Sequence, residues 1–340
     1  MVAINIDQYE ALRFGAGYID LIDRCWIALS GSDRADYLQG LLTNDVAALL
    51  PGTGCYAAYL TPKGRMIADM FVFSEQGRLL LDVHESVSEQ LRERFEELIF
   101  AEDVTVHGLG PERSAFGVHG PRSAAVISAI SGVGPKLSVN EHRPVAFGGS
   151  RGLLARTDDL GVEGYRLIVD RGIASEFEAL LVEAGAVRVD ALTTEAVRVE
   201  SGRPAFPRDM DTETIPLEAG IEDRAINFDK GCYVGQEVIV RILHRGQGRV
   251  ARRLVGLTLD GTSALDARLP KAGAVVWSAE GDDGIGRVTS AVISPALGKL
   301  IALGYVPRAL ADNPGAKVDV SIGDKRVCAV VTRLPFVDGK

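Results

Sequence analysis

One cysteine of this 340-residue chain lies in a setting that could support thiol chemistry. Cys232 belongs to the octapeptide Lys-Gly-Cys-Tyr-Val-Gly-Gln-Glu, residues 230–237. If the backbone is extended there, the side chains of Lys230 and Cys232 share a face, and a nearby ammonium favours the reactive thiolate. The flanking glycines permit tight turns or the close approach of a ligand to the backbone. The alternative is a buried structural cysteine, which is the commoner role of a free thiol.

A second candidate is Asp69, which follows the turn Lys63-Gly64 in the segment 60–69. Its neighbours Ile67 and Phe71 are apolar, so the carboxylate is expected to be partly desolvated. Burial of this kind favours either a hydrogen-bonded carboxylate or a raised pKa, and both are features of functional sites. The alternative is an exposed aspartate on the polar face of a half-buried strand.

A third candidate is Glu200, near the end of a helix predicted from about Thr193 with Gly202 as its C-terminal cap. A carboxylate can accept two hydrogen bonds at once from a ligand edge that carries two donors. On spacing alone, Glu200 and Arg198 could equally be neighbours on a solvated surface.

Two clusters of charged residues are further candidate binding sites. Asp209, Asp211 and Glu218 lack the ligand spacing of a calcium loop, so we interpret them as a solvated acidic segment. A basic stretch, 241–253, could bind an anionic ligand, a partner or RNA phosphates, or be a charged linker. It contains Arg241, His244, Arg245, Arg249, Arg252 and Arg253.

The elements that must position these residues fall into two patterns. The first part of the chain predicts two α+β units, about 1–110 and 111–245. Its strands are expected near 26–29, 54–60, 66–73, 79–83, 116–118, 153–155 and 165–169. Its helices are expected from Ser32 or Asp33 to Leu42, after a Ser86–Glu89 capping box, from Pro121 to Ile130, and after a Ser175–Glu178 capping box.

From 250 to 337 the pattern changes to short strands at roughly ten-residue spacing, which predicts a small antiparallel β-barrel. The expected strands are 255–259, 274–277, 285–291, 300–306, 317–322 and 325–333.

Bulk composition narrows the class of protein. The chain is 46% apolar and 24% charged, which is typical of a globular protein, and its net charge of −9 argues against general affinity for nucleic acid or anionic membranes. The 4 cysteines and 5 histidines show no metal-ligand spacing. No secretory or membrane-spanning segment is evident, so we expect a cytoplasmic protein without a bound metal.

The octapeptide 230–237 resembles the signature of the YgfZ group of folate-binding proteins, relatives of the glycine-cleavage T-protein (aminomethyltransferase). The segment 215–219 and the layout of two α+β units followed by a β-barrel are also similar. The resemblance implies the T-protein folate-binding fold, with tetrahydrofolate or a one-carbon derivative as cofactor. It implies that Asp69 faces the reactive N5/N10 edge, that Glu200 binds the pterin, and that Arg241 matches a basic position.

The resemblance leaves three functions open. The first, which we favour here, is a folate-binding protein that supports assembly or repair of iron–sulfur enzymes and, through them, tRNA modification. The second is a tetrahydrofolate-dependent aminomethyltransferase; against it stand Cys232 and Gln236 in the signature and the altered loop 160–164. The third is a folate-dependent scaffold. The candidate catalytic residues are Cys232, Asp69 and Lys230, and the candidate folate-binding residues are Glu200, Asp69, Arg198, Tyr233 and Arg241.

Overall fold

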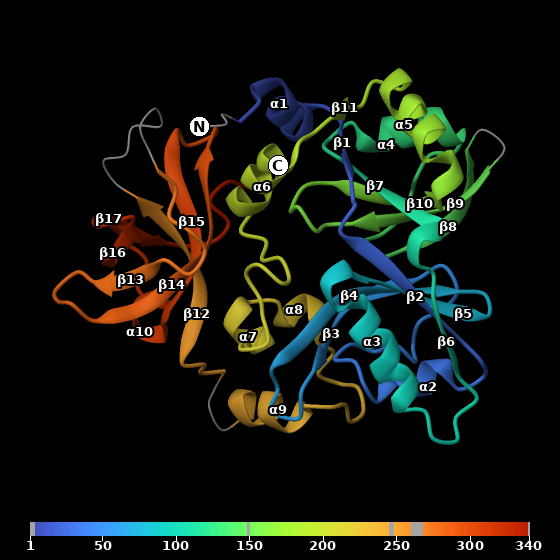
Figure 1. Ribbon diagram of the computed structural model, residues 1–340, viewed down its shortest axis with the longest axis horizontal. Coiled ribbons are helices and arrows are strands. Elements are labelled where there is room, and N and C mark those ends of the chain that lie inside the picture. Colours follow the sequence, from blue (N-terminus) through green and yellow to red (C-terminus); the bar gives the residue numbers. More distant parts are fainter. Residues whose placement is uncertain (1–3, 148–149, 245–247, 260–267, 339–340) are drawn as a thin grey trace.

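The computed structural model describes residues 4–147, 150–244, 248–259 and 268–338. Figure 1 shows a β-barrel on one side and two α+β units on the other, with the helix α6 (Ala191–Glu200) between them. The predicted fold class, two α+β units followed by an antiparallel barrel, is confirmed.

The first sheet has the strand order β3-β4-β5-β2-β6, and all of its pairs are antiparallel. Its apolar residues fall on both faces, because one face packs on helices and the other on the rest of the α+β region. Its strands are β2 (Arg24–Ser30), β3 (Gly54–Leu60), β4 (Met66–Glu75), β5 (Arg78–His84) and β6 (Thr105–Gly108).

The second sheet has the order β11-β1-β7-β10-β9-β8. Its first strand in the chain, β1, comes from the N-terminal segment and pairs with β7 and β11. The two sheets therefore do not divide the chain at a single point near residue 110. Its strands are β1 (Gly17–Asp20), β7 (Arg113–His119), β8 (His142–Phe147), β9 (Ser150–Thr157), β10 (Gly164–Asp170) and β11 (Val187–Arg188).

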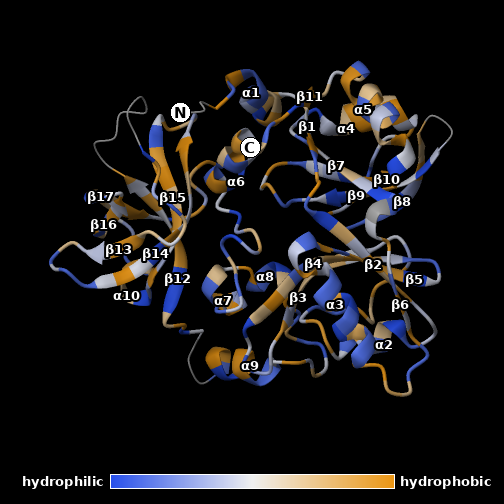
Figure 2. Ribbon diagram, in the orientation of Figure 1, coloured by the Kyte–Doolittle hydropathy of each residue, from blue (hydrophilic) through white to orange (hydrophobic). Residues whose placement is uncertain are grey.

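The C-terminal strands close into a barrel in the order β12-β15-β14-β13-β16-β17. In Figure 2, β15 is largely orange, because the residues 300–306 are buried in the barrel and against α6. The strands are β12 (Arg252–Leu259), β13 (Val275–Ser278), β14 (Gly284–Ser294), β15 (Lys299–Pro307), β16 (Lys317–Ile322) and β17 (Lys325–Thr332), each close to a predicted strand.

The helices differ from prediction at their ends: α2 ends at Gln39 and not at Leu42, and two helices begin without the predicted caps. The helix α3 is capped by His84 and not by Ser86, and α5 has no side-chain cap, so both predicted capping boxes are wrong. The helices are α1 (Ile6–Phe14), α2 (Arg34–Gln39), α3 (Glu85–Glu97), α4 (Ser123–Ser131), α5 (Ala174–Glu183), α6, α7 (Pro216–Ala219), α8 (Glu222–Ala225), α9 (Gln236–His244) and α10 (Arg308–Ala311).

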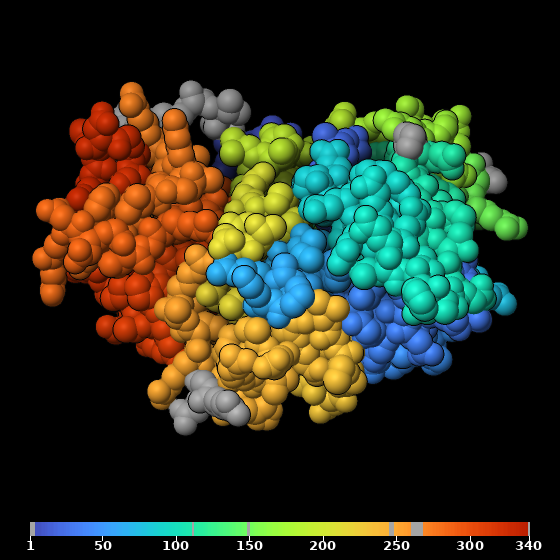
Figure 3. All heavy atoms as spheres, turned by 60° about the horizontal axis from the view of Figure 1, so that its bottom comes forward, coloured from blue at the N-terminus to red at the C-terminus, as the bar shows by residue number. Residues whose placement is uncertain are grey.

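The helices α7 to α9 connect the α+β region to the barrel. Figure 3 shows this gold segment at the surface between the orange barrel and the blue strands of the first unit. Part of the predicted basic linker is helical, since α9 runs to His244, whereas Arg245 lies outside the described residues.

Candidate functional site

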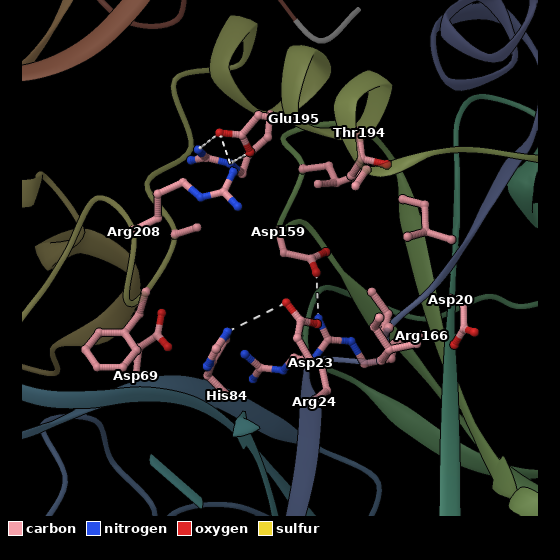
Figure 4. A pocket seen from close by; sticks show the side chains of 18 of the residues that line it. Asp20, Asp23, Arg24, Asp69, His84, Asp159, Arg166, Thr194, Glu195 and Arg208 are labelled. Carbon is pink, nitrogen blue, oxygen red and sulfur yellow. Dashed lines mark hydrogen bonds and ion pairs between the residues drawn. The ribbon is translucent and has the colours of Figure 1, made fainter. Parts of the chain in front are cut away.

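A cavity of about 710 Å³ lies where the edges of both sheets meet the start of α6. Its volume falls in the range of small-molecule sites, about 300–1,000 Å³. Figure 4 shows carboxylates and guanidinium groups facing the cavity from opposite sides, with Asp69 and His84 on one side and Glu195 and Arg208 on the other. The site is therefore built by segments far apart in the sequence.

Three polar residues form a row across the first sheet where it borders the cavity. In the antiparallel register of β2 with β5, Arg24 is opposite His84. In the register of β4 with β5, the last opposed residues are Met70 and Val83. Asp69 and His84 adjoin that last pair on their strands, and both line the cavity. Opposed residues point to the same face of a sheet, with Cβ atoms about 4.5–5.5 Å apart. Arg24, His84 and Asp69 therefore lie on the cavity side of the sheet.

Asp69 is nearly buried, with an exposed fraction of 8%. The Tyr56 hydroxyl donates to its Oδ2 at 2.6 Å, whereas no described residue donates a hydrogen bond to its Oδ1. The Arg224 guanidinium lies over the Tyr56 ring, 4.9 Å from its centroid, and so packs against the residue that holds Asp69. The arrangement leaves one carboxylate oxygen of Asp69 free to accept a proton or a hydrogen bond in the cavity.

A buried ion network joins the two sheets beneath this row. Asp82 is fully buried and accepts from Arg24 Nε at 2.6 Å and from Arg166. Arg166 also donates to Asp159 at 2.6 Å, and its guanidinium lies 4.8 Å from the centroid of the Phe71 ring. Burial opposes ionisation of Asp159, but the Arg166 guanidinium holds the pKa of this carboxyl well below its usual range. The charged side chains of this cavity wall therefore form ion pairs with one another.

The opposite wall is formed by the first turns of α6 and the segment 204–208. Glu195 accepts from Arg198 and from Arg208, and although burial opposes it, these two guanidiniums lower the pKa of Glu195 from 4.5 to about 2. Arg198 also contacts Asp209, which is buried and accepts from Ser290 Oγ of the barrel at 2.7 Å. The acidic segment is thus partly an internal anchor between α6 and the barrel, and our interpretation of Asp209 as solvated is wrong.

Aromatic side chains supply the apolar surface of the cavity. Tyr56 and Phe71 pack with ring centroids 5.3 Å apart, and Phe206 lines the cavity from the segment before α7. Flat rings with acidic and basic side chains at their edges suit a planar heterocycle that carries both donors and acceptors. The cavity's volume and side chains therefore fit a pterin.

The structure brings together only some of the residues proposed from sequence. Asp69 and Arg198 both line the cavity. Glu200 is fully buried and does not line the cavity. Its carboxylate accepts hydrogen bonds from the Tyr9 hydroxyl at 2.7 Å and from Ser294 Oγ, and it forms an ion pair with Arg13. Its carboxylate therefore joins α1, α6 and the barrel.

The octapeptide is also outside the cavity lining. Lys230 is buried, and its Nζ donates to the backbone oxygens of Gln39, Leu42 and Asn44 at 2.6–2.8 Å. Desolvation lowers the pKa of Lys230 to about 8. Cys232 is exposed in a segment without regular secondary structure whereas Lys230 is buried, and the alternative of a buried structural cysteine is wrong.

The two remaining candidates in this region also have local partners. Tyr233 packs against the Lys230 side chain, with Nζ 5.2 Å from the ring centroid, and burial raises the pKa of Tyr233 to about 12. Arg241 lies on α9 and pairs with Glu237 at 2.6 Å. Both contacts are consistent with structural roles.

Sequence reasoning missed most of the charged lining, including His84, Asp159, Arg166 and Glu195. One signal was visible: Asp82 and Arg166 each interrupt an apolar strand, at 79–83 and 165–169. Buried charges in such strands are paired, so each predicted an ionic partner. Nothing in the sequence indicated that they were partners of one another.

Comparison with known proteins assigns the chain to a family. The family described as "GCVT N-terminal domain" matches residues 1–230, and "Glycine cleavage T-protein C-terminal barrel domain" matches residues 252–338. The chain belongs to the glycine cleavage T-protein family. Tetrahydrofolate, the predicted cofactor, is the one that aminomethyltransferases of this family use.

Two relatives that match almost the whole chain are named aminomethyltransferase. The aminomethyltransferase of Synechococcus elongatus is 30% identical over 98% of this chain and 88% of its own length. That of Bacillus subtilis is 27% identical over 97% of this chain and 90% of its own. The solved aminomethyltransferase T of the Bartonella henselae glycine cleavage system matches with a TM-score of 0.87 at 23% identity, covering 98% of this chain and 90% of that one, which supports the fold.

These findings correct the function favoured from the octapeptide. The matched relatives are named aminomethyltransferase and extend over nearly the whole chain, so the interpretation as a protein supporting iron–sulfur enzymes and tRNA modification is wrong. The octapeptide on which that interpretation rested lies outside the cavity lining. Within the described residues, no group of three or more His, Cys, Asp or Glu is placed to hold a metal ion, and no helix is long and apolar enough to cross a membrane.

Proposed function

We propose that this protein is a tetrahydrofolate-dependent aminomethyltransferase and that its reaction takes place in the cavity beside Asp69. The proposal rests on one observation above others. A nearly buried carboxylate with one oxygen free of protein partners faces a pterin-sized aromatic cavity in a chain of the T-protein family. When bound, tetrahydrofolate supplies the two amines that accept the one-carbon unit.

The residues of the chain have separable roles in this proposal. Tyr56, Phe71 and Phe206 hold the flat ring and exclude water from one side of it. The free Oδ1 of Asp69 stabilises positive charge or accepts a proton where an amine becomes cationic. The Tyr56 hydroxyl, which donates to Oδ2, fixes the orientation of this carboxylate.

The network under the cavity keeps this geometry rigid. Arg24 and Arg166 pair with Asp82, and Arg166 also pairs with Asp159. These charges are therefore held within the wall, while the Asp69 carboxylate faces the cavity. Glu195 with Arg208 forms the wall on the far side, where the more exposed Arg208 could meet an anionic group. A rigid site of this type reduces the entropy cost of bringing the reacting groups together.

The test is the Asp69→Asn variant. We expect its rate of ammonia release from an aminomethyl donor to fall about 100-fold or more, because Asn keeps the volume but loses charge and proton affinity. The matched control is Asp324→Asn, at an exposed turn of the barrel. Wild-type rates in the Asp69→Asn variant, or a wild type without activity towards tetrahydrofolate, would contradict the proposal.

A further inference from the structure

One histidine, His84, is among the described residues that line the cavity, and Asp69 lines the same cavity from the neighbouring strand β4. It is half-buried, with a side-chain exposed fraction of 18%. Figure 4 shows its ring on the same side of the cavity as Asp69, with Asp23 as its neighbour. A histidine beside a carboxylate in a ligand-sized cavity is a common arrangement for proton transfer.

The ring is oriented by the first turn of α3. Its Nδ1 lies 2.8 Å from Ser86 Oγ and 3.2 Å from the Ser86 backbone N–H. Its Nε2 lies 3.7 Å from Asp23 Oδ2 at the cavity. In the structure Nδ1 accepts from the Ser86 backbone N–H. In the doubly protonated ring this bond is replaced by donation from Nδ1–H to Ser86 Oγ, and Nε2–H is directed to Asp23. Loss of the Nε2 proton then leaves a lone pair on the cavity side.

The charged groups around the ring come from each neighbouring strand. On β2, Arg24 is opposite His84 but donates to Asp82, and β4 contributes the Asp69 carboxylate to the same cavity. Next to it on its own chain is the exposed Glu85, which begins α3. The Asp23 carboxylate is directed to Nε2, and the Asp69 carboxylate lines the same cavity.

We infer that His84 is a proton-relay residue, which holds a proton at Nε2 and passes it to the leaving group while Asp69 stabilises the accepting amine. This inference rests on the proposed function. Transfer from a carrier X–CH2–NH2 to two N–H groups gives X–H, NH3 and N–CH2–N, so hydrogens and charge balance without an oxidant. The two amine protons replace those taken up by X and by the amino group. His84 is regenerated when one of these protons returns to Nε2.

The first test is independent of turnover. The ring resonances of the 5 histidines are followed by NMR against pH, with and without tetrahydrofolate, and His84 is assigned from the His84→Asn spectrum. We expect the His84 titration to change when tetrahydrofolate is added. The His107 titration should not change, because His107 is an exposed residue of β6 that does not line this cavity.

The second test is the pH profile of single-turnover methylene transfer. Asn is a favourable helix N-cap, so His84→Asn should retain the start of α3 while removing the titrating nitrogen. We expect a rate loss of about 100-fold or more and loss of one limb of the profile, with tetrahydrofolate affinity within about twofold of the wild type. His107→Asn is the matched control and should keep the wild-type profile.

The outcomes separate the two proposals. Failure of the wild type to bind tetrahydrofolate would overturn the proposed function and this inference with it. Binding by the wild type, with an unresponsive His84 ring and an unchanged profile in His84→Asn, would overturn only the role of His84. If His84→Asn folds poorly, the wild-type NMR titration decides alone, with assignment from His84→Gln.

Discussion

Removal of the charge of Asp82 should destabilise the α+β region by about 3 kcal/mol. Asp82 is fully buried and is the anion that joins Arg24 on β2 to Arg166 on β10 of the second sheet. Asp82→Asn preserves the volume of the side chain but leaves two buried guanidiniums without this partner. It therefore tests whether the two sheets are joined through the ions beneath the cavity.

The magnitude follows from burial. The side chain of Arg166 is 3% exposed and that of Arg24 is 13% exposed. Loss of one partner of a buried ion pair costs about 3–5 kcal/mol, because a desolvated charge is left uncompensated. Arg166 retains Asp159, so we expect the lower end of this range, or about two decades in the folding equilibrium constant.

The chain offers a local probe for the assay. Its 2 tryptophans are Trp26 in the first sheet and Trp277 in the barrel, and Trp26 is directly opposite Asp82 in the pairing of β2 with β5. In a Trp277→Phe background, urea unfolding followed by fluorescence reports on the α+β region and avoids treating the whole chain as one two-state unit.

The control is Glu213→Gln in the same background. Glu213 pairs with Arg65 at the surface, where the two side chains are 67% and 40% exposed. Such pairs contribute about 0–1 kcal/mol. If Asp82→Asn costs no more than Glu213→Gln, the buried ions do not hold the sheets together and the reasoning is refuted.

Two further predictions concern other buried carboxylates. Glu200→Gln should lower the free energy of unfolding by about 3 kcal/mol, since Arg13 loses a buried partner, yet leave tetrahydrofolate affinity in calorimetry within about twofold. An affinity loss of one to two decades would instead place Glu200 at the ligand. Because the folded pKa of Glu195 is lowered from 4.5 to about 2, its contribution is complete above pH 4.5 and is lost as pH falls towards 2. The unfolding free energies of wild type and Glu195→Gln, measured in urea at pH 7 and at pH 3, should converge by about 2 kcal/mol; a constant difference would show that Glu195 is not coupled to Arg198 and Arg208.

The sequence was most informative where local pattern decides structure. The alternation of apolar residues in 317–322 predicted β16 closely, because that strand buries one face in the barrel. The largely apolar runs 300–306 and 66–73 predicted β15 and β4, which are buried on both faces, and β4 carries Asp69 to the cavity.

The predictions that were wrong or missing concern contacts between segments far apart in the sequence. Neither the pairing of β1 with β7 nor the ion pair from Asp82 to Arg166 has a local signal, since partners 84 residues apart meet only in the folded chain. Glu200 was proposed as a ligand because of its place in the chain, but its helix turns the carboxylate towards Tyr9 and the barrel. Lys230 of the octapeptide likewise donates hydrogen bonds to backbone oxygens and not to the neighbouring thiol.

The central claim is that the cavity beside Asp69 binds tetrahydrofolate. The most direct measurement is a calorimetric titration of tetrahydrofolate into the wild type and into Thr194→Trp, whose new ring would occupy the cavity from the first turns of α6. The account predicts saturable one-to-one binding on the order of micromolar for the wild type, about −8 kcal/mol, and none for the variant. Absence of binding to the wild type, or equal binding to both proteins, would contradict it.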